Sequence, residues 1–436
     1  MKDGLMNKIL GKLGFTKETL IRFIVIALGS QFIYSLNALR AVLYDPFRDT
    51  LGITNTQIGF LYSTVALVGM FAYIPATWFT DRFSGRKIMT VSLLFVGLSA
   101  IVMANSPAYP VLVFIFIMWG FLQEGPFWAS VLKSVRCTAT EDKQGTAFGA
   151  LEFLRGSVEF FTNGLAIVIF TWVGHSIFGM QVAMYINGGF IIATGLLCWF
   201  VLPEDHFLKG ETNKEKNVEV MHGIKKAIFL PEAWLTGITA CGIYTVYVGV
   251  QWFVPFLTNV YMMPIAAAAI FGLFNTSLTR MVASPTGGVI ADNKFGSSVN
   301  FMRYALAAVV VLLGAVFLVP KSADLMYLVM GIMIFVTIAV YMLRGVYFAP
   351  IGEMHTPKSM SGAALSIAAL IAYSPAFWLN TINGYLLDTY SPEQAYGRIF
   401  MIMIAGASIG FISANIMYRR VKRFKQQQCS ESITAK

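Results

Sequence analysis

Long apolar runs recur along almost the whole chain, from Leu20 to Tyr418. A helix needs about 20 apolar residues to cross the hydrocarbon core of a bilayer, whereas a membrane barrel is built from alternating segments of about ten residues. The runs have the helical length, and no series of alternating segments occurs. Only 12% of the 436 residues are charged, roughly half the share found in soluble domains. The sequence therefore predicts an all-α membrane protein.

The apolar runs predict twelve transmembrane helices in two six-helix halves that are related to each other. The predicted spans are 20–46, 57–80, 88–105, 109–134, 145–171, 180–202, 233–258, 264–290, 302–319, 325–351, 360–387 and 396–418. The connections are short except for one polar stretch that divides the chain. We therefore expect a cytoplasmic N-terminus 1–19, an N-terminal six-helix bundle 20–202, a cytoplasmic central loop 203–232, a C-terminal six-helix bundle 233–418 and a basic cytoplasmic tail 419–436.

The distribution of Lys and Arg predicts the orientation. Most of the 32 basic residues lie in the termini, the central loop and the alternate loops on the same side, whereas Arg48, Lys321 and Arg398 fall in the opposite loops. Basic residues in short loops remain cytoplasmic, so we expect both termini inside the cell. The net charge of +10 then reports topology and contact with the lipid bilayer, and we expect no nucleic-acid partner.

Other functional classes find no support in the sequence. The four cysteines show neither metal nor redox spacing, so we expect no disulfide framework, no metal site and no cofactor. No His-Glu-x-x-His, Gly-x-Ser-x-Gly or nucleotide-binding loop occurs, so we expect no enzyme. A channel is disfavoured because no selectivity-filter sequence is present. A membrane sensor that transports nothing remains an alternative.

Two pairs of segments indicate that the halves are related. Asp81-Arg82-Phe83-Ser84-Gly85-Arg86-Lys87 follows span 2, and an aspartate, Asp292, closes span 8 in a similar setting. Glu124-Gly125-Pro126-Phe127-Trp128-Ala129 in span 4 matches Arg344-Gly345-Val346-Tyr347-Phe348-Ala349 in span 10, and Lys133 matches Glu353 at the same offset. Internal repeats of this size are typical of transporters that rock two halves around a central site.

The loop after span 2 resembles the cytoplasmic motif of the major facilitator superfamily, Gly-x-x-x-Asp-Arg-x-Gly-Arg-Lys. Thr77 stands at the first glycine of the motif, and Ser84 adds one residue before Gly85. The nearest resemblance is to uncharacterised bacterial inner-membrane members. It implies a monomeric secondary transporter in the inner membrane that works by alternating access. The chain is more distantly similar to organophosphate antiporters; Arg40 lies near their first-helix arginine, but span 7 contains no Arg or Lys.

Ionisable residues inside the membrane are the strongest pointers to function. Span 5 carries Glu152, Arg155, Glu159 and Asn163, which fall on one face of a helix. We expect Arg155 to bind an anionic group while Glu152 or Glu159 exchanges a proton. The alternative is a self-neutralised ion triad that only stiffens helix contacts.

Four further charged residues are candidates for gating. Glu124, which is also a candidate for proton coupling, and Arg344 occupy equivalent places with opposite charge, and Lys133 and Glu353 repeat the arrangement nearer the cytoplasm. They can pair across the two halves. They can equally pair within each half, for example Lys133 with Glu152. We also expect mechanical contacts from the loop motif and its second copy, through Asp81, Arg82, Arg86 and Asp292.

Two arginines are candidates for binding a solute anion. Arg40 shares a helix face with Asn37, and Arg280 lies close to Thr276. Arginine suits carboxylate, phosphate and sulfonate because its planar fork donates two parallel hydrogen bonds. The alternative for Arg40 is snorkelling to the outer interface, and the alternative for Arg280 is pairing with a buried carboxylate.

Aromatic and amide side chains of spans 7 and 11 complete the candidate solute site, although such residues also pack helices or face lipid. They are Tyr244, Tyr247, Gln251, Tyr373 and Asn380. Six prolines are expected to kink their spans, namely Pro75, Pro126, Pro255, Pro285, Pro350 and Pro375.

The balance of buried charge favours an anionic solute. We assign five basic residues to the membrane interior, Arg40, Lys133, Arg155, Arg280 and Arg344, against four acidic ones, Glu124, Glu152, Glu159 and Glu353, the last of which lies two residues beyond its predicted span. We expect a small organic anion, such as a sugar acid, a phosphorylated or sulfonated sugar or a carboxylate, driven by a proton or a counter-solute. A proton-coupled symporter of a neutral sugar or polyol is the runner-up, and multidrug export comes third.

Overall fold

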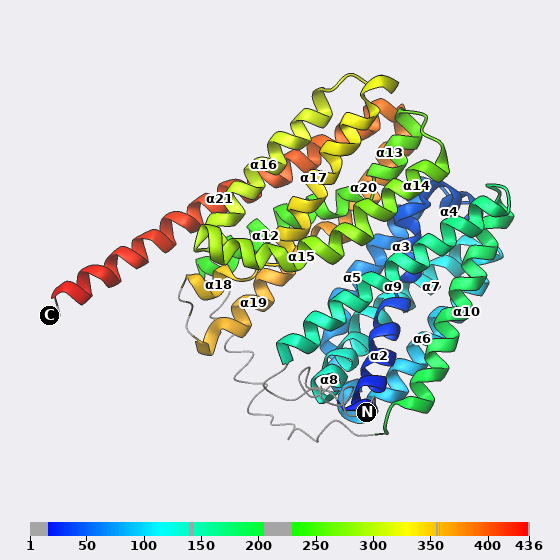
Figure 1. Cartoon of the computed structure of the whole chain (residues 1–436), viewed down its shortest axis with the longest axis horizontal. Helices are drawn as coiled ribbons and strands as arrows, with labels where there is room; N and C mark the ends of the chain where they lie inside the picture. The colour runs from blue at the N-terminus through cyan, green and yellow to red at the C-terminus, as the bar shows by residue number, and fades with distance from the viewer. Residues whose placement is uncertain (1–15, 139–143, 205–228, 355, 357, 435–436) are drawn as a thin grey trace, which may run out of the picture. The chain divides into compact units, whose positions relative to one another are not determined.

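The structure, a computed structural model, describes residues 16–138, 144–204, 229–354, 356 and 358–434. Within these ranges all regular secondary structure is helical (Figure 1). In the first half of the sequence the elements are α2 (Lys17–Phe32), α3 (Ser35–Val42), α4 (Tyr44–Leu51), α5 (Asn55–Arg82), α6 (Gly85–Ala104), α7 (Tyr109–Leu122), η1 (Gln123–Phe127), α8 (Trp128–Thr138), α9 (Gln144–Trp172) and α10 (Ile177–Val201).

The second half continues the helical series. Its elements are α12 (Pro231–Val250), α13 (Phe253–Val260), α14 (Ile265–Leu273), η3 (Phe274–Leu278), α15 (Thr279–Ile290), η4 (Ala291–Phe295), α16 (Ser298–Leu318), η5 (Ala323–Leu325), α17 (Met326–Arg344), α18 (Pro350–Glu353), α19 (Lys358–Tyr373), α20 (Pro375–Thr389) and α21 (Pro392–Thr434). The short elements η1, η3 and η4 are π-helical.

Each predicted span coincides with one helix or with a broken set of helices. Ten helices in the described ranges are long and apolar enough to cross a membrane, and the bent pair α2–α3 supplies an eleventh. The 28-residue helix α5 occupies the remaining predicted span, 57–80. The expected all-α membrane fold is therefore confirmed, although its orientation in the bilayer remains a prediction.

Serine and threonine side chains begin several of these helices. At the start of α5 the Thr54 hydroxyl accepts a hydrogen bond from the Gln57 amide at 3.2 Å, and the Gln57 side chain accepts from the Thr54 amide at 2.9 Å. Ser84, Ser176 and Ser297 cap α6, α10 and α16 in a similar way. These caps satisfy amides that have no partner within the helix, so they fix where each span starts.

Several spans break near their middle, often at a predicted proline. Gly125 has non-helical angles (φ −94°, ψ −105°) directly before Pro126 inside η1, and Pro375 begins α20. Pro255 lies three residues beyond the gap between α12 and α13. In contrast, Pro75 and Pro285 lie inside α5 and α15, which continue through them.

The predicted span 325–351 is interrupted before Pro350, one of the six prolines expected to kink their spans. Its helix α17 ends at Arg344, and residues 345–349 form turns before α18 begins at Pro350. Proline has no amide hydrogen and clashes with a preceding helical turn, so the segment before Pro350 leaves the helical path.

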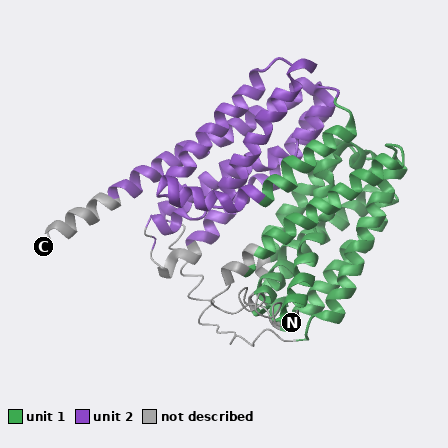
Figure 2. Cartoon of the chain, viewed as in Figure 1, with its two compact units in different colours: residues 1–210, 263–281 green, residues 211–262, 282–436 purple. Residues whose placement is uncertain are grey.

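The chain divides into two compact units (Figure 2). Unit 1 comprises Met1–Gly210 and Met263–Met281, and unit 2 comprises Glu211–Met262 and Val282–Lys436. The segment Met263–Met281 thus packs with unit 1 although it belongs to the second half of the sequence. The central stretch 205–228 lies outside the described residues, and the predicted bundle borders at 202 and 233 remain predictions.

Glycines allow the closest helix contacts within each unit. In unit 1 a Cβ added at Gly97 would lie 3.0 Å from the carbonyl oxygen of Gly188, where α6 meets α10. In unit 2 a Cβ added at Gly242 would lie 2.5 Å from the carbonyl oxygen of Gly406, where α12 meets α21. Small residues let membrane helices approach closely and gain van der Waals contact, and these contacts hold the helices that carry the candidate site.

Candidate functional site

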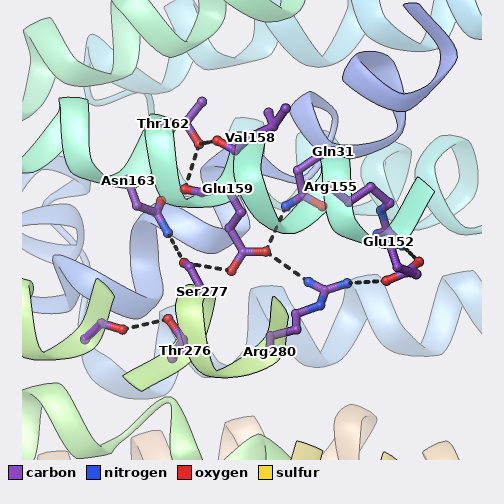
Figure 3. Close-up of polar contacts among 11 residues, drawn as sticks. Gln31, Glu152, Arg155, Val158, Glu159, Thr162, Asn163, Thr276, Ser277 and Arg280 are labelled. Carbon is purple, nitrogen blue, oxygen red and sulfur yellow. Dashed lines mark hydrogen bonds and ion pairs between the residues drawn. The ribbon is translucent and has the colours of Figure 1, made fainter. Parts of the chain in front are cut away.

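A buried carboxylate, that of Glu159 on α9, lies at the centre of the main polar cluster of unit 1 (Figure 3). Its Oε2 accepts from the Gln31 amide at 3.0 Å and from the Arg280 guanidinium at 2.9 Å. Its Oε1 accepts from the Ser277 hydroxyl at 3.1 Å. Helix α2, the π-turn η3 and the first turn of α15 therefore all meet at one side chain of α9.

Arg280 links this carboxylate to a second one. Its second terminal nitrogen lies 3.6 Å from Oε2 of Glu152, and Oε1 of Glu152 accepts from Arg155 at 2.6 Å. The expected face of span 5 thus enters one network, but the pairing differs from the expected triad, because Arg280 rather than Arg155 pairs with Glu159. Arg280 thus pairs with a buried carboxylate, the alternative considered for it, and its role in binding a solute anion remains a prediction.

The network, defined as Glu152, Arg155, Glu159 and Arg280, contains two positive and two negative side chains. Only 8% of the Glu159 side chain and 10% of the Arg155 side chain are exposed, compared with 52% for Glu152. Buried charge is costly unless it is paired, so the balance explains how these residues are tolerated. The half-exposed Glu152 contributes the weaker interactions because solvent screens them.

The π-turn η3 brings polar atoms to this network. A π-turn inserts a residue into the helix and is frequent at functional sites. Ser277 is fully buried in η3, and its hydroxyl contacts both Glu159 and the Asn163 amide, the latter at 3.3 Å. Asn275, also in η3, is 1% exposed, and neither polar atom of its side chain has a hydrogen-bond partner among the described residues.

A second polar cluster joins the break between α2 and α3 to η1. The Tyr34 hydroxyl donates to the backbone oxygen of Gln123 at 3.1 Å, and the Asn37 amide donates to the Gln123 side chain at 3.3 Å. Glu124 interacts electrostatically with Arg155 and with the Tyr34 hydroxyl, all within unit 1. This arrangement favours the within-half alternative for Glu124, whose role remains a prediction.

Arg40 lies elsewhere in unit 1. It is 3% exposed, and its guanidinium carbon lies 3.5 Å from the centroid of the Tyr62 ring. A cation over an aromatic face gains electrostatic energy that increases with burial. Arg40 and Asn37, which the sequence places on one helix face, therefore make separate contacts, Arg40 with Tyr62 and Asn37 with Gln123.

The tyrosines predicted for the solute site cluster around Arg344 in unit 2. The guanidinium carbon of Arg344 lies 3.8 Å from the Tyr247 ring centroid and 5.8 Å from that of Tyr244. Tyr244 also contacts the Tyr373 ring, with centroids 5.1 Å apart. Asn380 donates to a backbone oxygen of its own helix at 3.0 Å.

The side chains predicted for gating lie near helix ends. Arg82 lies over the Trp78 ring at 4.9 Å and Arg86 over the Trp199 ring at 4.3 Å, while the Asp81 side chain lies outside the described residues. Lys133 donates to the Thr80 hydroxyl at 2.8 Å. The Arg86 contact joins α6 to α10, and the Lys133 contact joins α8 to α5, all in unit 1.

Glu353 of α18 makes the corresponding contact in unit 2. It accepts from the Ser298 amide at 2.6 Å and from the Ser297 hydroxyl, at the N-terminus of α16. A carboxylate is favoured there by the exposed amides and by the helix dipole. Asp292, which was expected to make mechanical contacts in this half, is exposed in η4, and its role remains a prediction.

Comparison with known proteins identifies the family. The family model described as Major Facilitator Superfamily matches residues 23–379 of this chain. The chain belongs to the Major Facilitator Superfamily. This superfamily member is therefore a multi-pass membrane protein and a secondary transporter, and the expectation that it is not an enzyme is confirmed by the same membership.

Two relatives of this superfamily member come from Escherichia coli (strain K12). Inner membrane protein YihN is 28% identical over 417 residues, which cover 94% of this chain and 98% of YihN. Inner membrane protein YqcE is 23% identical over 409 residues, which cover 92% and 95% of the two chains. Both relatives therefore match this chain over nearly its full length.

A solved structure supports the fold of the superfamily member. A bacterial homologue of the human lysosomal transporter Spinster, in an inward-facing and unoccupied conformation, matches with a TM-score of 0.71 at 16% identity. The match covers 95% of this chain and 99% of that chain. The likeness extends to the fold alone.

The site of this superfamily member contains residues that sequence reasoning missed. Gln31 and Ser277 both contact Glu159, and the signal available for each was a lone polar residue inside an apolar run. Among the described residues, no group of His, Cys, Asp and Glu side chains could hold a metal ion.

Proposed function

We propose that this superfamily member carries a small organic anion across the bacterial inner membrane together with a proton. The solute class is a sugar acid, a phosphorylated or sulfonated sugar, or a carboxylate. One observation carries the proposal: the buried carboxylate of Glu159 is paired at 2.9 Å with Arg280. A proton and the anion-binding Arg280 side chain therefore compete for the Glu159 carboxylate. The inner-membrane names of YihN and YqcE support the location.

The charge balance of the network links proton and anion. While both carboxylates are ionised, the network is neutral. When Glu159 takes up a proton, Glu152 is the one ionised carboxylate left within the network, and the network gains one positive charge. A bound anion offsets part of this added charge, and an uncompensated buried charge costs several kcal/mol. Proton and anion therefore stabilise one another, which by linkage is the energetic basis of symport.

The same ion pair supplies a contact suited to alternating access. Transporters of this kind need contacts between the halves of the sequence that form in one state and break in another. Glu159 belongs to the first half and Arg280 to the second. Protonation of Glu159 removes the charge that holds Arg280, so proton binding weakens this contact and favours the state in which it is broken.

A neutral sugar or polyol, carried with a proton, is the second candidate solute. The ring contact between Tyr244 and Tyr373 favours it, because aromatic faces and hydroxyl groups suit polyhydroxylated rings. Tyrosines of the same cluster also lie close to Arg344, and a neutral solute has no charge that could pair with this guanidinium. The anion therefore remains the primary proposal.

Uptake into reconstituted vesicles tests the proposal. We expect glucuronate, gluconate or glucose 6-phosphate to enter faster when the outside is acidic relative to the lumen, and glucose to enter slowly. Glu159→Gln cannot exchange a proton, so its uptake should no longer respond to the proton gradient. Glu393→Gln is the matched control, because Glu393 is exposed at the start of α21 and should keep the response.

Three outcomes would contradict the proposal. Uptake of glucose alone favours the neutral-sugar candidate. A response to the proton gradient that survives in Glu159→Gln removes the role of the Glu159 carboxylate. Uptake of none of these solutes by the wild-type protein favours a sensor that transports nothing.

A further inference from the structure

We propose that Arg344 and the tyrosines around it form the binding site for the anionic group of the solute. The tyrosine cage, as we name it, consists of Tyr244, Tyr247, Tyr341, Tyr347 and Tyr373. The inference rests on the proposed function and assigns its anion site to unit 2. The sequence had suggested a gating role for Arg344, so the inference also changes the role of that residue.

Two tyrosine rings lie close to the guanidinium of Arg344. Tyr247 and Tyr244 lie 3.8 and 5.8 Å from it, and Tyr341 and Tyr347 are further neighbours. The Tyr347 and Tyr373 hydroxyls hydrogen-bond to each other at 2.9 Å. The Tyr247 ring lies against the planar fork and restrains it before any solute arrives. Such preorganisation reduces the entropy lost on binding.

Arg344 has no carboxylate partner in the described part of the chain. No ion pair and no hydrogen bond joins it to any described residue, and its Nε is buried without a partner. A guanidinium carries five N–H donors, and a buried charged donor such as this Nε–H is costly to leave unsatisfied. In unit 1, by contrast, each arginine of the network is paired with a glutamate. Arg344 therefore lacks the anion that its surroundings require.

The tyrosine cage lies where three spans are interrupted. Tyr247 is near the middle of the α12–α13 span, close to the gap at Gln251 and Trp252. Tyr373 is the last residue of α19, directly before the break at Ser374, and Arg344 is the last residue of α17. Substrate sites of secondary transporters lie near the membrane midplane and are formed by discontinuous helices. The position of the cage fits such a site.

A purely structural role for Arg344 is the rival explanation. A cation at a helix C-terminus gains from the helix dipole, and the Tyr247 face adds cation–π attraction. Both effects act on the charge as a whole, yet neither satisfies the N–H donors. A carboxylate, sulfonate or phosphate would satisfy two of them at once through parallel hydrogen bonds, while a tyrosine ring covers the apolar face of the solute.

The cage and the network differ in when they attract an anion. Arg155 and Arg280 carry uncompensated charge only after Glu159 binds a proton. Arg344 carries its charge in every state, because arginine stays protonated in proteins. Anion binding should therefore depend on Arg344, and proton coupling on Glu159. Because of this difference, an experiment can contradict the Arg344 anion site without contradicting proton coupling through Glu159, and the reverse.

Binding to purified full-length protein tests the inference. We expect glucuronate or glucose 6-phosphate to bind the wild-type protein in titration calorimetry, and glucose to bind at least about tenfold more weakly because it lacks the charged group. Arg344→Gln should weaken binding of the anions at least about tenfold. Arg344→Lys should recover only part of the affinity, because lysine keeps the charge but loses the fork.

Matched variants distinguish a binding role from a folding role. Arg398→Gln removes another arginine of unit 2 that lies over a tyrosine, at 3.3 Å from the Tyr390 ring, and should leave anion affinity unchanged. Tyr247→Leu keeps the Arg344 charge and should weaken binding less than Arg344→Gln. If Arg344→Gln is too unstable to purify, Arg344→Lys and Tyr247→Leu carry the comparison.

The outcomes are decisive for each idea separately. Undiminished anion binding in Arg344→Gln, or in both substitute variants, overturns the inference and leaves the proton-coupled proposal standing. Glu159→Gln should bind the anions and fail only in coupling. Loss of binding in Glu159→Gln but not in Arg344→Gln would move the anion site to unit 1. Absence of anion binding by the wild-type protein overturns the inference and the proposed function together.

Discussion

The Arg280 guanidinium is the cation paired with the buried Glu159 carboxylate. Arg280→Gln leaves that charge with only the neutral partners Gln31 and Ser277. Breaking a buried ion pair by removing one partner costs roughly 3–5 kcal/mol. We expect Arg280→Gln to lower the free energy of unfolding by about 3 kcal/mol, and thermal unfolding of the purified protein in detergent measures the change.

The double variant Glu159→Gln/Arg280→Gln provides the control. Because it removes both charges, it should be more stable than Arg280→Gln alone, and the two effects should not add. Additive losses would mean that the two side chains do not interact, contrary to their 2.9 Å contact.

At the residue scale the sequence predicted a helix face but not a partner. The helical period placed Glu152, Arg155 and Glu159 together, and all three enter one network. The pairing of Glu159 with Arg280 depends on how α9 packs against η3 and α15, which periodicity within one span cannot reveal. The absence of a described partner for Arg344 likewise became visible only in the folded chain.

At the scale of elements, Glu353 fastens α18 to the first turn of α16. Glu353→Gln keeps a side-chain oxygen but loses the charge that favours the helix N-terminus. We expect a loss of about 1 kcal/mol in unfolding free energy, measured by thermal unfolding. Asp292→Asn is the matched control, since Asp292 is exposed in η4 and should change stability little. An equal loss in both variants would argue against the Glu353 contact.

The packing of α12 against α21 depends on Gly242. An added Cβ would lie 2.5 Å from the Gly406 carbonyl oxygen and 2.8 Å from the Gly410 Cα. Both are backbone atoms that cannot rotate away, so Gly242→Ala should force the helices apart and lower the thermal midpoint by several degrees. Gly314→Ala in α16 meets open space within 4 Å and should not. Equal behaviour of the two variants would refute the close approach.

The sequence predicted the elements better than their interruptions. The length of the apolar runs alone located every span, because a helix needs about 20 apolar residues to cross the bilayer. Proline indicated the breaks at Pro126 and Pro375. No residue pattern indicated the π-turn η3, whose register depends on polar contacts of Asn163 and Glu159 with Ser277. Proline also indicated an interruption at Pro350, although the turns begin several residues earlier, at Gly345.

For the whole molecule, the asymmetry of Lys and Arg predicts the topology, which remains to be measured. In a variant whose native cysteines are replaced, Lys214→Cys in the central loop should resist a membrane-impermeant maleimide applied to intact cells. Ser322→Cys, in the opposite loop before η5, should react. Labelling of Lys214→Cys from outside would reverse the orientation and undermine the expected cytoplasmic termini.

At the same scale the sequence predicted two related halves but not the way the described chain divides. The segment Met263–Met281 packs with unit 1, so the candidate network combines residues from both halves of the sequence. Such a division depends on helix packing, and the apolar pattern that defines the spans contains no information about it. The solute class also depends on a few side chains rather than on the fold, since one fold serves many functions.

Proton movement driven by the solute tests coupled transport most directly. Vesicles that contain the protein and a luminal pH indicator, with no initial gradient, receive glucuronate, gluconate or glucose 6-phosphate from outside. The account predicts that the lumen acidifies with the wild-type protein, and that Glu159→Gln vesicles show no acidification although they still bind the anion. Entry of the anion without any change in luminal pH, or acidification that persists in Glu159→Gln, would contradict it.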